Sequence, residues 1–408
     1  MTPSAPAVSF ALTLAAALLA FRYGHDVLKL ALAGQHPDLG AYVLYTRGAW
    51  AGVNTFAPDG LADATRGFTS SYTASPPTFA PGGYLVILPI AWLPYRAAAW
   101  LWVAIGQASV LTASLAWGRL VGLGGVLATA AAIVTLAYQP ILENVATGQL
   151  SLLILALLAL GIAADRAGHR LLAAVPLSLA LQLKPHYILL VVFLAWIGAR
   201  TLALLTLAFI VLWSAVAVLL FGSAWLSGYW TGVRGLAKSA HLHHWIRNLS
   251  PHAMLHRLTG AEGGAVVIEI AAVTLALAVG AIVLWAARPP LPTASDLTLA
   301  AWSMAIAALP LAAPLTEEHH LVLLLLPILF AVAHAHELEP WWRTALVVAI
   351  VLLASPYSFE SFGTFDHGLL SLVHGGKTGG AALLLAVVGR LAWRARAGSP
   401  GIEAWARG

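Results

Sequence analysis

Apolar runs recur along almost the whole chain, from Ala7 to Trp393, and short polar breaks rich in Arg, Pro, Gly or His separate them. The runs are roughly 13 to 24 residues long, close to the roughly 20 residues that a helix needs to cross a bilayer. Many of the Trp and Tyr residues stand near the run ends, where interfacial aromatic belts form. The pattern predicts an all-α, polytopic transmembrane helical bundle of about 11 to 13 spans.

Two long polar interruptions divide this pattern, one over residues 22–82 and one over residues 222–264. The first apolar run, Ala7 to Phe21, has no basic segment before it, so we expect a retained helix rather than a cleaved signal peptide. No internal repeat or soluble domain is visible. We therefore predict one integral membrane domain over residues 1–408, with a large first loop at 22–82 and a second at 222–264.

Arginines set the expected orientation of the helices. Arg390, Arg394 and Arg396 end the last run, which places the C-terminus in the cytoplasm under the positive-inside rule. Counting helices backward from there puts these polar residues on the outer face: Asn144, Gln149, Lys184, Asn248, His319 and His320.

Counting forward gives a conflict. It places the 22–82 loop outside and Arg96 inside, so residues 96–138 would need an odd number of crossings, yet they look like two helices. Either a re-entrant segment or one kinked span around Lys184-Pro185 would remove the conflict, because proline is tolerated inside a span where neighbours satisfy the freed carbonyl.

Composition supports a membrane protein and excludes other classes. The chain is 60% hydrophobic and 9% charged, whereas soluble domains carry charge on about a quarter of their residues. The net charge of +5 comes from basic residues scattered through connecting loops, so we expect them to orient helices and predict no nucleic-acid partner. The absence of cysteine excludes disulfides and thiol chemistry. The excess of Ala, Leu, Gly and Arg suggests a GC-rich bacterial gene.

Asp38 is the first candidate for chemistry. It follows His36-Pro37 at the start of the large loop, and an aromatic, helical-looking stretch with Tyr42 and Tyr45 comes behind it. It either caps this short helix or acts as a general base that accepts a proton from a sugar hydroxyl. Both roles are compatible, since a helix N-terminus keeps a carboxylate ionised.

Lys184 stands between apolar residues, where a lysine is costly unless it has a partner or a function. It either meets an anion such as a lipid phosphate or extends to the headgroups along its aliphatic stem. The stretch from Asn144 to Gln149 is either a simple polar turn or a set of amide positioning groups.

The pair His319-His320 follows Glu317-Glu318 at the start of an apolar run. Neighbouring side chains on a helix point about 100° apart, unlike the i, i+4 histidines of a helical zinc site, so we predict no metal here. Hydrogen bonding to a phosphate or sugar is favoured, since helix N-termini suit anions. The two glutamates also suit a helix N-terminus, and the sequence leaves a catalytic role for them open.

In this order, the features resemble the bacterial polyprenyl-phosphate-mannose-dependent α-mannosyltransferases of glycosyltransferase family 87, which have the GT-C fold. The resemblance covers most of the chain and rests on five places: Asp38 to Trp50; Tyr72 to Pro94 with Tyr84 and Pro89; Gly148-Gln149; Leu183-Lys184-Pro185; and Asn248-Leu-Ser250 followed by Pro314 to His320. The chain departs from the family at Glu317-Glu318, where an aromatic residue is expected before the His pair. That departure leaves the role of the His pair and the acceptor open.

The resemblance implies a hexosyltransferase of the bacterial inner membrane with its active site on the extracytoplasmic side. It implies a polyprenyl-phosphate sugar donor, a lipid or glycan acceptor, surrounding membrane lipids, an inverted α linkage, and neither cofactor nor metal. Asp38 would be the catalytic base. The residues expected to bind the donor phosphate or sugar are Lys184, His319, His320, Gln149, Asn144 and Tyr84.

Two other readings stay open. A secondary transporter would also be multispan, but transporters tend to have repeated halves and charges at mid-membrane, whereas here the polar residues gather at one face. Another lipid-linked glycan polymerase or ligase, or an enzyme with a pentose donor such as arabinofuranose, would share that face and differ in the donor.

Overall fold

In the computed structural model, residues 5–55, 79–237, 247–260, 266–289, 291, 296–356, 368–373 and 375–397 are described. Within these ranges every regular element is a helix, and no strand is present. Ala- and Leu-rich runs favour helices, and a helix satisfies its own backbone hydrogen bonds within a membrane. The all-α prediction is therefore confirmed for the part of the chain that the structure describes.

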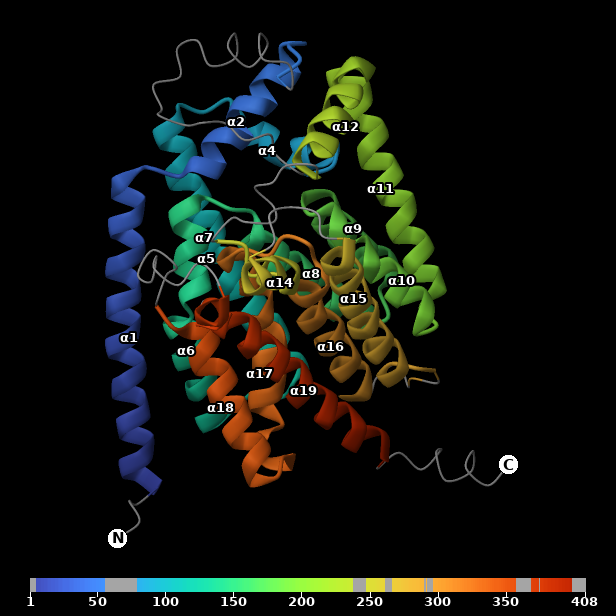
Figure 1. The fold of residues 1–408 in the computed structure, drawn as a ribbon. Coiled ribbons are helices and arrows are strands. Elements are labelled where there is room, and N and C mark those ends of the chain that lie inside the picture. Colours follow the sequence, from blue (N-terminus) through green and yellow to red (C-terminus); the bar gives the residue numbers. More distant parts are fainter. Residues whose placement is uncertain are drawn as a thin grey trace.

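The helices form a bundle, with α2, α4 and α12 gathered at one end of it (Figure 1). The α-helices are α1 (Ala5–Ala33), α2 (Pro37–Trp50), α4 (Gly83–Ala91), α5 (Tyr95–Leu120), α6 (Gly125–Ala137), α7 (Gln139–Thr147), α8 (Ser151–Arg166), α9 (Arg170–Leu183), α10 (Leu189–Trp196), α11 (Arg200–Phe221), α12 (Ser223–Ala237), α14 (Pro251–Thr259), α15 (Val266–Ala286), α16 (Asp296–Ala312), α17 (Leu325–Ala333), α18 (Pro340–Ala354) and α19 (Gly376–Ala397). The 3-10 helices are η1 (Pro185–Ile188), η2 (Glu318–Leu324), η3 (Ala335–Glu337) and η5 (Gly368–Leu372).

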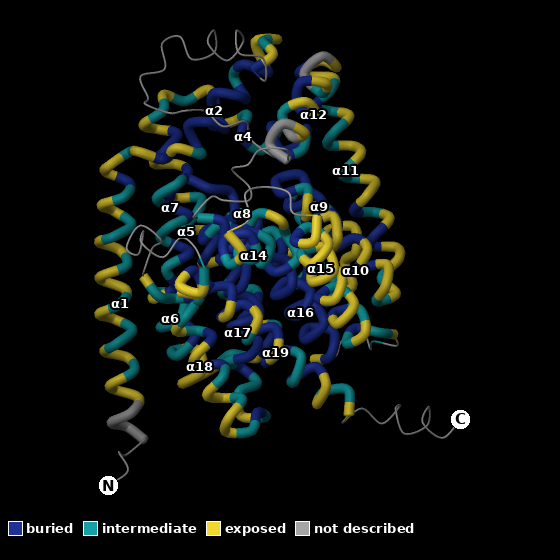
Figure 2. Tube along the Cα trace, in the orientation of Figure 1, coloured by how far each residue is buried: buried dark blue, intermediate teal, exposed yellow. Residues whose placement is uncertain are grey.

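Three of the described helices, α5, α11 and α15, are long and apolar enough to cross a membrane. The pair α6 and α7 makes a fourth candidate if its 42° bend lies within one span. Several other described helices are apolar but shorter, among them α9, α16 and α18. Leucine and valine side chains point outward on α11, where Leu204 is 67% exposed and Leu219 is 84% exposed. Apolar surface of this kind suits lipid rather than water, and Figure 2 shows exposed positions along α1, α11 and α15 at the rim.

Helix α4 is too short to cross a membrane by itself. It has nine residues with Pro89 inside it, so it is about 14 Å long, whereas a hydrocarbon core is about 30 Å thick. It packs against α2, and the two short helices lie together at one end of the bundle (Figure 1). The side of the membrane on which Arg96 lies stays a prediction.

The boundaries of the two expected loops also differ from the sequence interpretation. Helix α1 continues to Ala33, so residues 22–33 are helical, and a side-chain ion pair between Arg22 and Asp26 at 3.6 Å supports this part of the helix. Helix α2 occupies residues 37–50 of the first loop, and α12 and α14 occupy much of the second. The expected loop boundaries rest on the length of apolar runs. A helix that contains polar residues interrupts such a run, and run length alone therefore assigns it to a loop.

The centre of the bundle consists of α16, η2 and α17, whose residues are nearly all buried (Figure 2). Trp302 of α16 packs edge-on against Phe193 of α10 with ring centroids 5.1 Å apart. The hydroxyl of Tyr138 donates to the carbonyl oxygen of Leu321 at 2.7 Å, which ties η2 to the α6–α7 bend. This packing fixes η2, and with it the segment that carries the two histidines.

Candidate active site

Asp38, Tyr42 and Gln149 form one hydrogen-bonded unit. Gln149 Nε2 donates to Asp38 Oδ2 at 2.8 Å, and the Tyr42 hydroxyl donates to Gln149 Oε1 at 2.8 Å. Asp38 and Tyr42 are four residues apart on α2 and so share a face of that helix. Burial raises the pKa of the Asp38 carboxyl, while the Gln149 hydrogen bond and the charge of Lys184 act in the opposite direction. A carboxylate tuned in this way suits a general base.

Asp38 does not cap its helix. The N-cap of α2 is His36 and Pro37 takes the first helical position, because the fixed φ of proline suits that position and its missing N–H costs nothing there. Asp38 thus lies in the first turn of α2, and its carboxylate accepts a hydrogen bond from Gln149, which lies between α7 and α8. Of the two roles that the sequence left open for Asp38, capping is excluded.

A close approach between Gly148 and the start of α2 brings Asp38 to Gln149. Gly148 ends α7 in the left-handed conformation, at φ +73°, and a Cβ there would lie 2.8 Å from the Cβ atoms of both His36 and Leu39. His36 Nδ1 lies 2.8 Å from the carbonyl oxygen of Val145, and the Tyr95 hydroxyl donates to the carbonyl oxygen of His36 at 3.0 Å. Only glycine satisfies both the conformation and the contact.

Lys184 and His320 form a second buried unit. Lys184 lies at the break between α9 and η1, its exposed fraction is 6%, and its Nζ is 2.6 Å from His320 Nε2. His320 Nδ1 accepts a hydrogen bond from the backbone N–H of Glu317 at 3.0 Å. The histidine therefore bridges the start of η2 to the lysine.

The protons in this unit can be counted from its hydrogen bonds. Because Nδ1 of His320 accepts from the Glu317 N–H, the neutral imidazole carries its proton on Nε2. Nε2 then donates to Lys184, and this contact is satisfied when Lys184 is an uncharged amine, since an ammonium group has no acceptor. An anion placed beside Lys184 would favour the ammonium form instead.

Glu317 is the third ionisable group near Lys184. Burial raises the pKa of its carboxyl to about 8, and the charge of Lys184 opposes this shift. Burial therefore favours the protonated form of the Glu317 carboxyl. His319 lies 3.6 Å from Glu317 through its Nδ1, and its buried Nε2 has no hydrogen-bond partner within the described ranges.

These units lie near one another. Asp38 and Lys184 influence each other electrostatically, as do Asp38 and Glu317, and Tyr42 lies in the field of both carboxyls. A small pocket adjoins His320, lined by His186, Tyr187, Leu309, Pro310, Ala313, Leu315, Thr316, His320 and Leu323. The arrangement places a proton acceptor, Asp38, near two hydrogen-bond donors, Lys184 and His320, that can bind an anion.

The structure places two other expected residues outside this centre. Asn144 is buried at the junction of α7 and α8, where its amide, in the orientation that satisfies both of its ends, donates to the Gln149 carbonyl at 3.0 Å and accepts from Ser151 N–H at 3.3 Å. Tyr84 is buried against Phe79 with ring centroids 4.4 Å apart, and Phe79 in turn contacts Tyr42 at 5.3 Å. Asn144 therefore contacts Gln149 directly, and Tyr84 contacts Tyr42 only through Phe79.

The segment before the His pair is held by the Asn-x-Ser stretch singled out in the sequence. Asn248 Oδ1 accepts from the N–H of Thr316 at 3.1 Å, and both Asn248 Nδ2 and Ser250 Oγ donate to the carbonyl oxygen of Pro314, at 3.0 and 2.9 Å. The two distant parts of this motif are therefore in direct contact.

A buried ion pair between Lys377 and Glu318 was not predicted from the sequence. Lys377 of α19 is fully buried, and its Nζ contacts Glu318 Oε1. The single lysine near the start of an apolar, Gly-rich helix was the available signal, because a buried lysine needs an acidic partner. The pair links η2 to α19.

The described residues form an all-helical bundle with candidate membrane spans, and its polar centre lies where several helices meet. This is the architecture of a helical membrane protein with a buried polar site. The family model of glycosyltransferase family 87 matches residues 78–314, more than half of the chain. The chain belongs to this family, and the protein is a glycosyltransferase. The match includes Gln149 and Lys184, the two histidines follow shortly after its end, and Asp38 lies well before its start. No curated protein and no solved structure matches the chain.

Proposed function

We propose that this protein transfers a sugar, mannose foremost, from a polyprenyl-phosphate donor to a lipid or glycan acceptor, and that the reaction inverts the anomeric centre to give an α linkage. In this proposal the chain has the GT-C fold, its spans number about 11 to 13, and the active site faces the extracytoplasmic side of a bacterial inner membrane. Family membership supports glycosyl transfer in general. The remaining support comes from the chemistry of the site.

The observation that carries the proposal is that the charges of Asp38, Lys184 and Glu317 influence one another, and that Lys184 in turn contacts His320. The acceptor hydroxyl gives its proton to the Asp38 carboxylate, and its oxygen attacks the anomeric carbon of a β-linked donor. The bond between that carbon and the phosphate oxygen breaks, and the phosphate leaves with the electron pair. Attack opposite to the leaving group gives the inverted glycoside.

The leaving phosphate gains charge as this bond breaks, so groups that donate hydrogen bonds to it accelerate the reaction. Lys184 in its ammonium form and the Nε2–H of His320 are the donors closest to hand, and the buried Nε2 of His319 is a third candidate. Gln149 holds the Asp38 carboxylate in place. Burial favours the neutral form of the Glu317 carboxyl, which reduces its repulsion toward the phosphate.

A polyprenyl chain needs an apolar surface that opens to the lipid. A crevice with an empty volume of about 820 Å³ lies between α1, the α6–α7 bend and the end of α18. Its apolar lining includes Leu19, Leu136, Leu142 and Val351, and Arg22, Asp26, Gln139 and Ser355 add polar groups. The crevice supports the proposal because it borders α7, whose C-cap Gly148 directly precedes Gln149.

The test is sugar transfer by the purified protein in lipid nanodiscs. Radiolabelled polyprenyl-phosphate-mannose, polyprenyl-phosphate-arabinofuranose and a nucleotide-activated mannose are each supplied with a membrane lipid and glycan extract as acceptor. We expect label to pass from polyprenyl-phosphate-mannose only, into a product that α-mannosidase releases. Transfer from the nucleotide sugar alone, or a product that only β-mannosidase releases, contradicts the proposal. Transfer from the arabinofuranose donor alone assigns the pentose alternative.

A further inference from the structure

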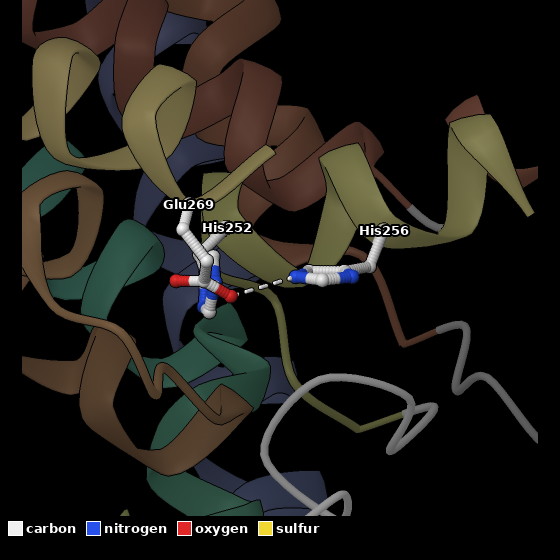
Figure 3. A group of neighbouring side chains, drawn as sticks. All are labelled: His252, His256 and Glu269. Atoms are coloured by element: carbon white, nitrogen blue, oxygen red, sulfur yellow. Dashed lines mark hydrogen bonds and ion pairs between the residues drawn. The ribbon is translucent and has the colours of Figure 1, made fainter. Parts of the chain in front are cut away.

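Two histidines and a glutamate converge in a place that the proposed reaction does not use. His252 and His256 are four residues apart on α14, so their side chains leave the same face of that helix. Glu269 comes from the first turn of α15 and meets both rings (Figure 3). The three side chains therefore join two successive helices.

The distances suit a metal ion. The Nε2 atoms of His252 and His256 lie 3.0 and 3.2 Å from the same oxygen, Glu269 Oε1, and the three candidate ligand atoms all lie within 4.8 Å of one another. In a tetrahedral zinc site with bonds of about 2.0 to 2.1 Å, neighbouring ligand atoms are about 3.3 Å apart. The two His–Glu separations are close to this value.

The burial of the three side chains is graded. The side chain of His256 is fully buried and that of His252 is 11% exposed, whereas that of Glu269 is 42% exposed. The histidines are thus held by the protein, and solvent reaches the cluster from the glutamate side. A three-ligand zinc site needs this asymmetry, because its fourth position is taken by water or a ligand from solution.

We propose that His252, His256 and Glu269 bind a zinc ion that links α14 to α15. The donor set of two imidazoles and one carboxylate suits zinc, whereas magnesium and calcium prefer oxygen ligands alone. The i, i+4 spacing of histidines on a helix is the spacing at which two imidazoles reach one metal. The competing arrangement is a carboxylate that hydrogen-bonds two imidazoles with no ion between them.

The position of α14 gives the ion a structural consequence. Ser250 caps α14 by accepting from the N–H of Ala253 at 3.1 Å, and the same serine and Asn248 hold Pro314 and Thr316. Thr316 immediately precedes Glu317, where the segment with the two histidines of the candidate active site begins. Zinc that fixes α14 on α15 would therefore also stabilise the contacts of Asn248 and Ser250 with Pro314 and Thr316. The zinc site itself does not depend on the identity of the sugar donor.

The test uses the full chain in detergent micelles, stripped of metal with a chelator and titrated with Zn²⁺ against a chromogenic zinc indicator. We expect one zinc ion per chain for the wild type, and affinity at least about 100-fold weaker for the His252→Asn/His256→Asn double variant. His334→Asn/His336→Asn, which changes two histidines outside the cluster, is the matched control and should bind like the wild type. A wild type that binds no more tightly than the double variant overturns the proposal.

Two further measurements separate metal binding from folding. Zinc should raise the melting temperature of the wild type and leave that of Glu269→Gln almost unchanged, since this variant keeps both imidazoles and the shape of the side chain. Cobalt substituted for zinc should give the strong visible absorption of a tetrahedral complex. A weak, octahedral-type cobalt spectrum, or an equal zinc effect on the Glu269→Gln variant, contradicts a site built from these three residues.

Discussion

Lys184 Nζ lies 2.6 Å from Nε2 of His320, although 136 positions separate the two residues in the chain. One stands at a break between helices and the other in a 3-10 helix, so neither belongs to a regular span. The contact joins the break after α9 to the start of η2. An anion that reaches this pair meets two hydrogen-bond donors at once.

Replacing Asp38 with Asn should remove the base and leave the fold intact. The amide oxygen of Asn can still accept from Gln149, so we expect little change in melting temperature and a fall in transfer of about 10²- to 10⁴-fold. Sugar transfer and thermal unfolding of the same preparation measure both effects. Asp165→Asn, at the far end of α8, is the control. Transfer at the wild-type rate by the Asp38→Asn variant would exclude Asp38 from the mechanism.

Glu317 should control the alkaline limb of the pH profile. Its pKa of about 8 means that the carboxyl ionises as pH rises through 8, and the new negative charge then competes with the donor phosphate for Lys184. The donor KM should increase above pH 8 in the wild type and stay flat in Glu317→Gln. The acid limb, set by the raised pKa of Asp38, should be shared by both proteins because activity falls as that carboxylate becomes protonated. An alkaline limb that persists in Glu317→Gln is the contrary result.

Lys184→Ala should weaken donor binding. A charge-assisted hydrogen bond contributes about 1.5 to 3 kcal/mol, which corresponds to an increase in donor KM of about 10- to 100-fold. Initial rates over a range of donor concentrations measure it. Lys29→Ala removes an exposed lysine of α1 and should have no effect. If KM and turnover of the Lys184→Ala variant equal those of the wild type, the lysine only reaches toward the headgroups.

Gly148→Ala should abolish transfer, while Gly168→Ala should not. Both glycines have positive φ, +73° and +82°, so both variants incur backbone strain of about 1 to 2 kcal/mol. Only at Gly148 would the new Cβ also collide with His36 and Leu39, whereas nothing lies within 4 Å at Gly168. The difference between the two variants in activity and melting temperature isolates the docking of α2. Equal losses would show that strain alone matters.

The buried pair of Lys377 and Glu318 should behave as a unit. Removing one partner of a buried ion pair leaves an uncompensated charge and costs about 3 to 5 kcal/mol. Lys377→Met should therefore lower the melting temperature strongly, and adding Glu318→Leu should restore most of it. The comparison of both single variants with the double variant measures the coupling between the residues. Additive losses would contradict a direct interaction.

Part of the candidate site could be predicted from local signals. Lys184 was identifiable because a lysine among apolar residues needs a partner, and Asp38 because a carboxylate stands at the start of an aromatic helix. The partners themselves could not be predicted. Nothing in the order of residues distinguishes His320, which contacts Lys184, from His319, which does not. The cluster of His252, His256 and Glu269 was missed because its third member comes from a separate helix.

The sequence by itself determined that this protein is a helical membrane protein, because run length and composition are local quantities that a bilayer acts on directly. Only the tertiary structure decided that α2 docks on Gly148, that Gln149 bonds to Asp38, and that Lys184 contacts His320. Those outcomes depend on packing between segments more than 100 positions apart. Apolar periodicity contains no information about which of many apolar helices lie side by side.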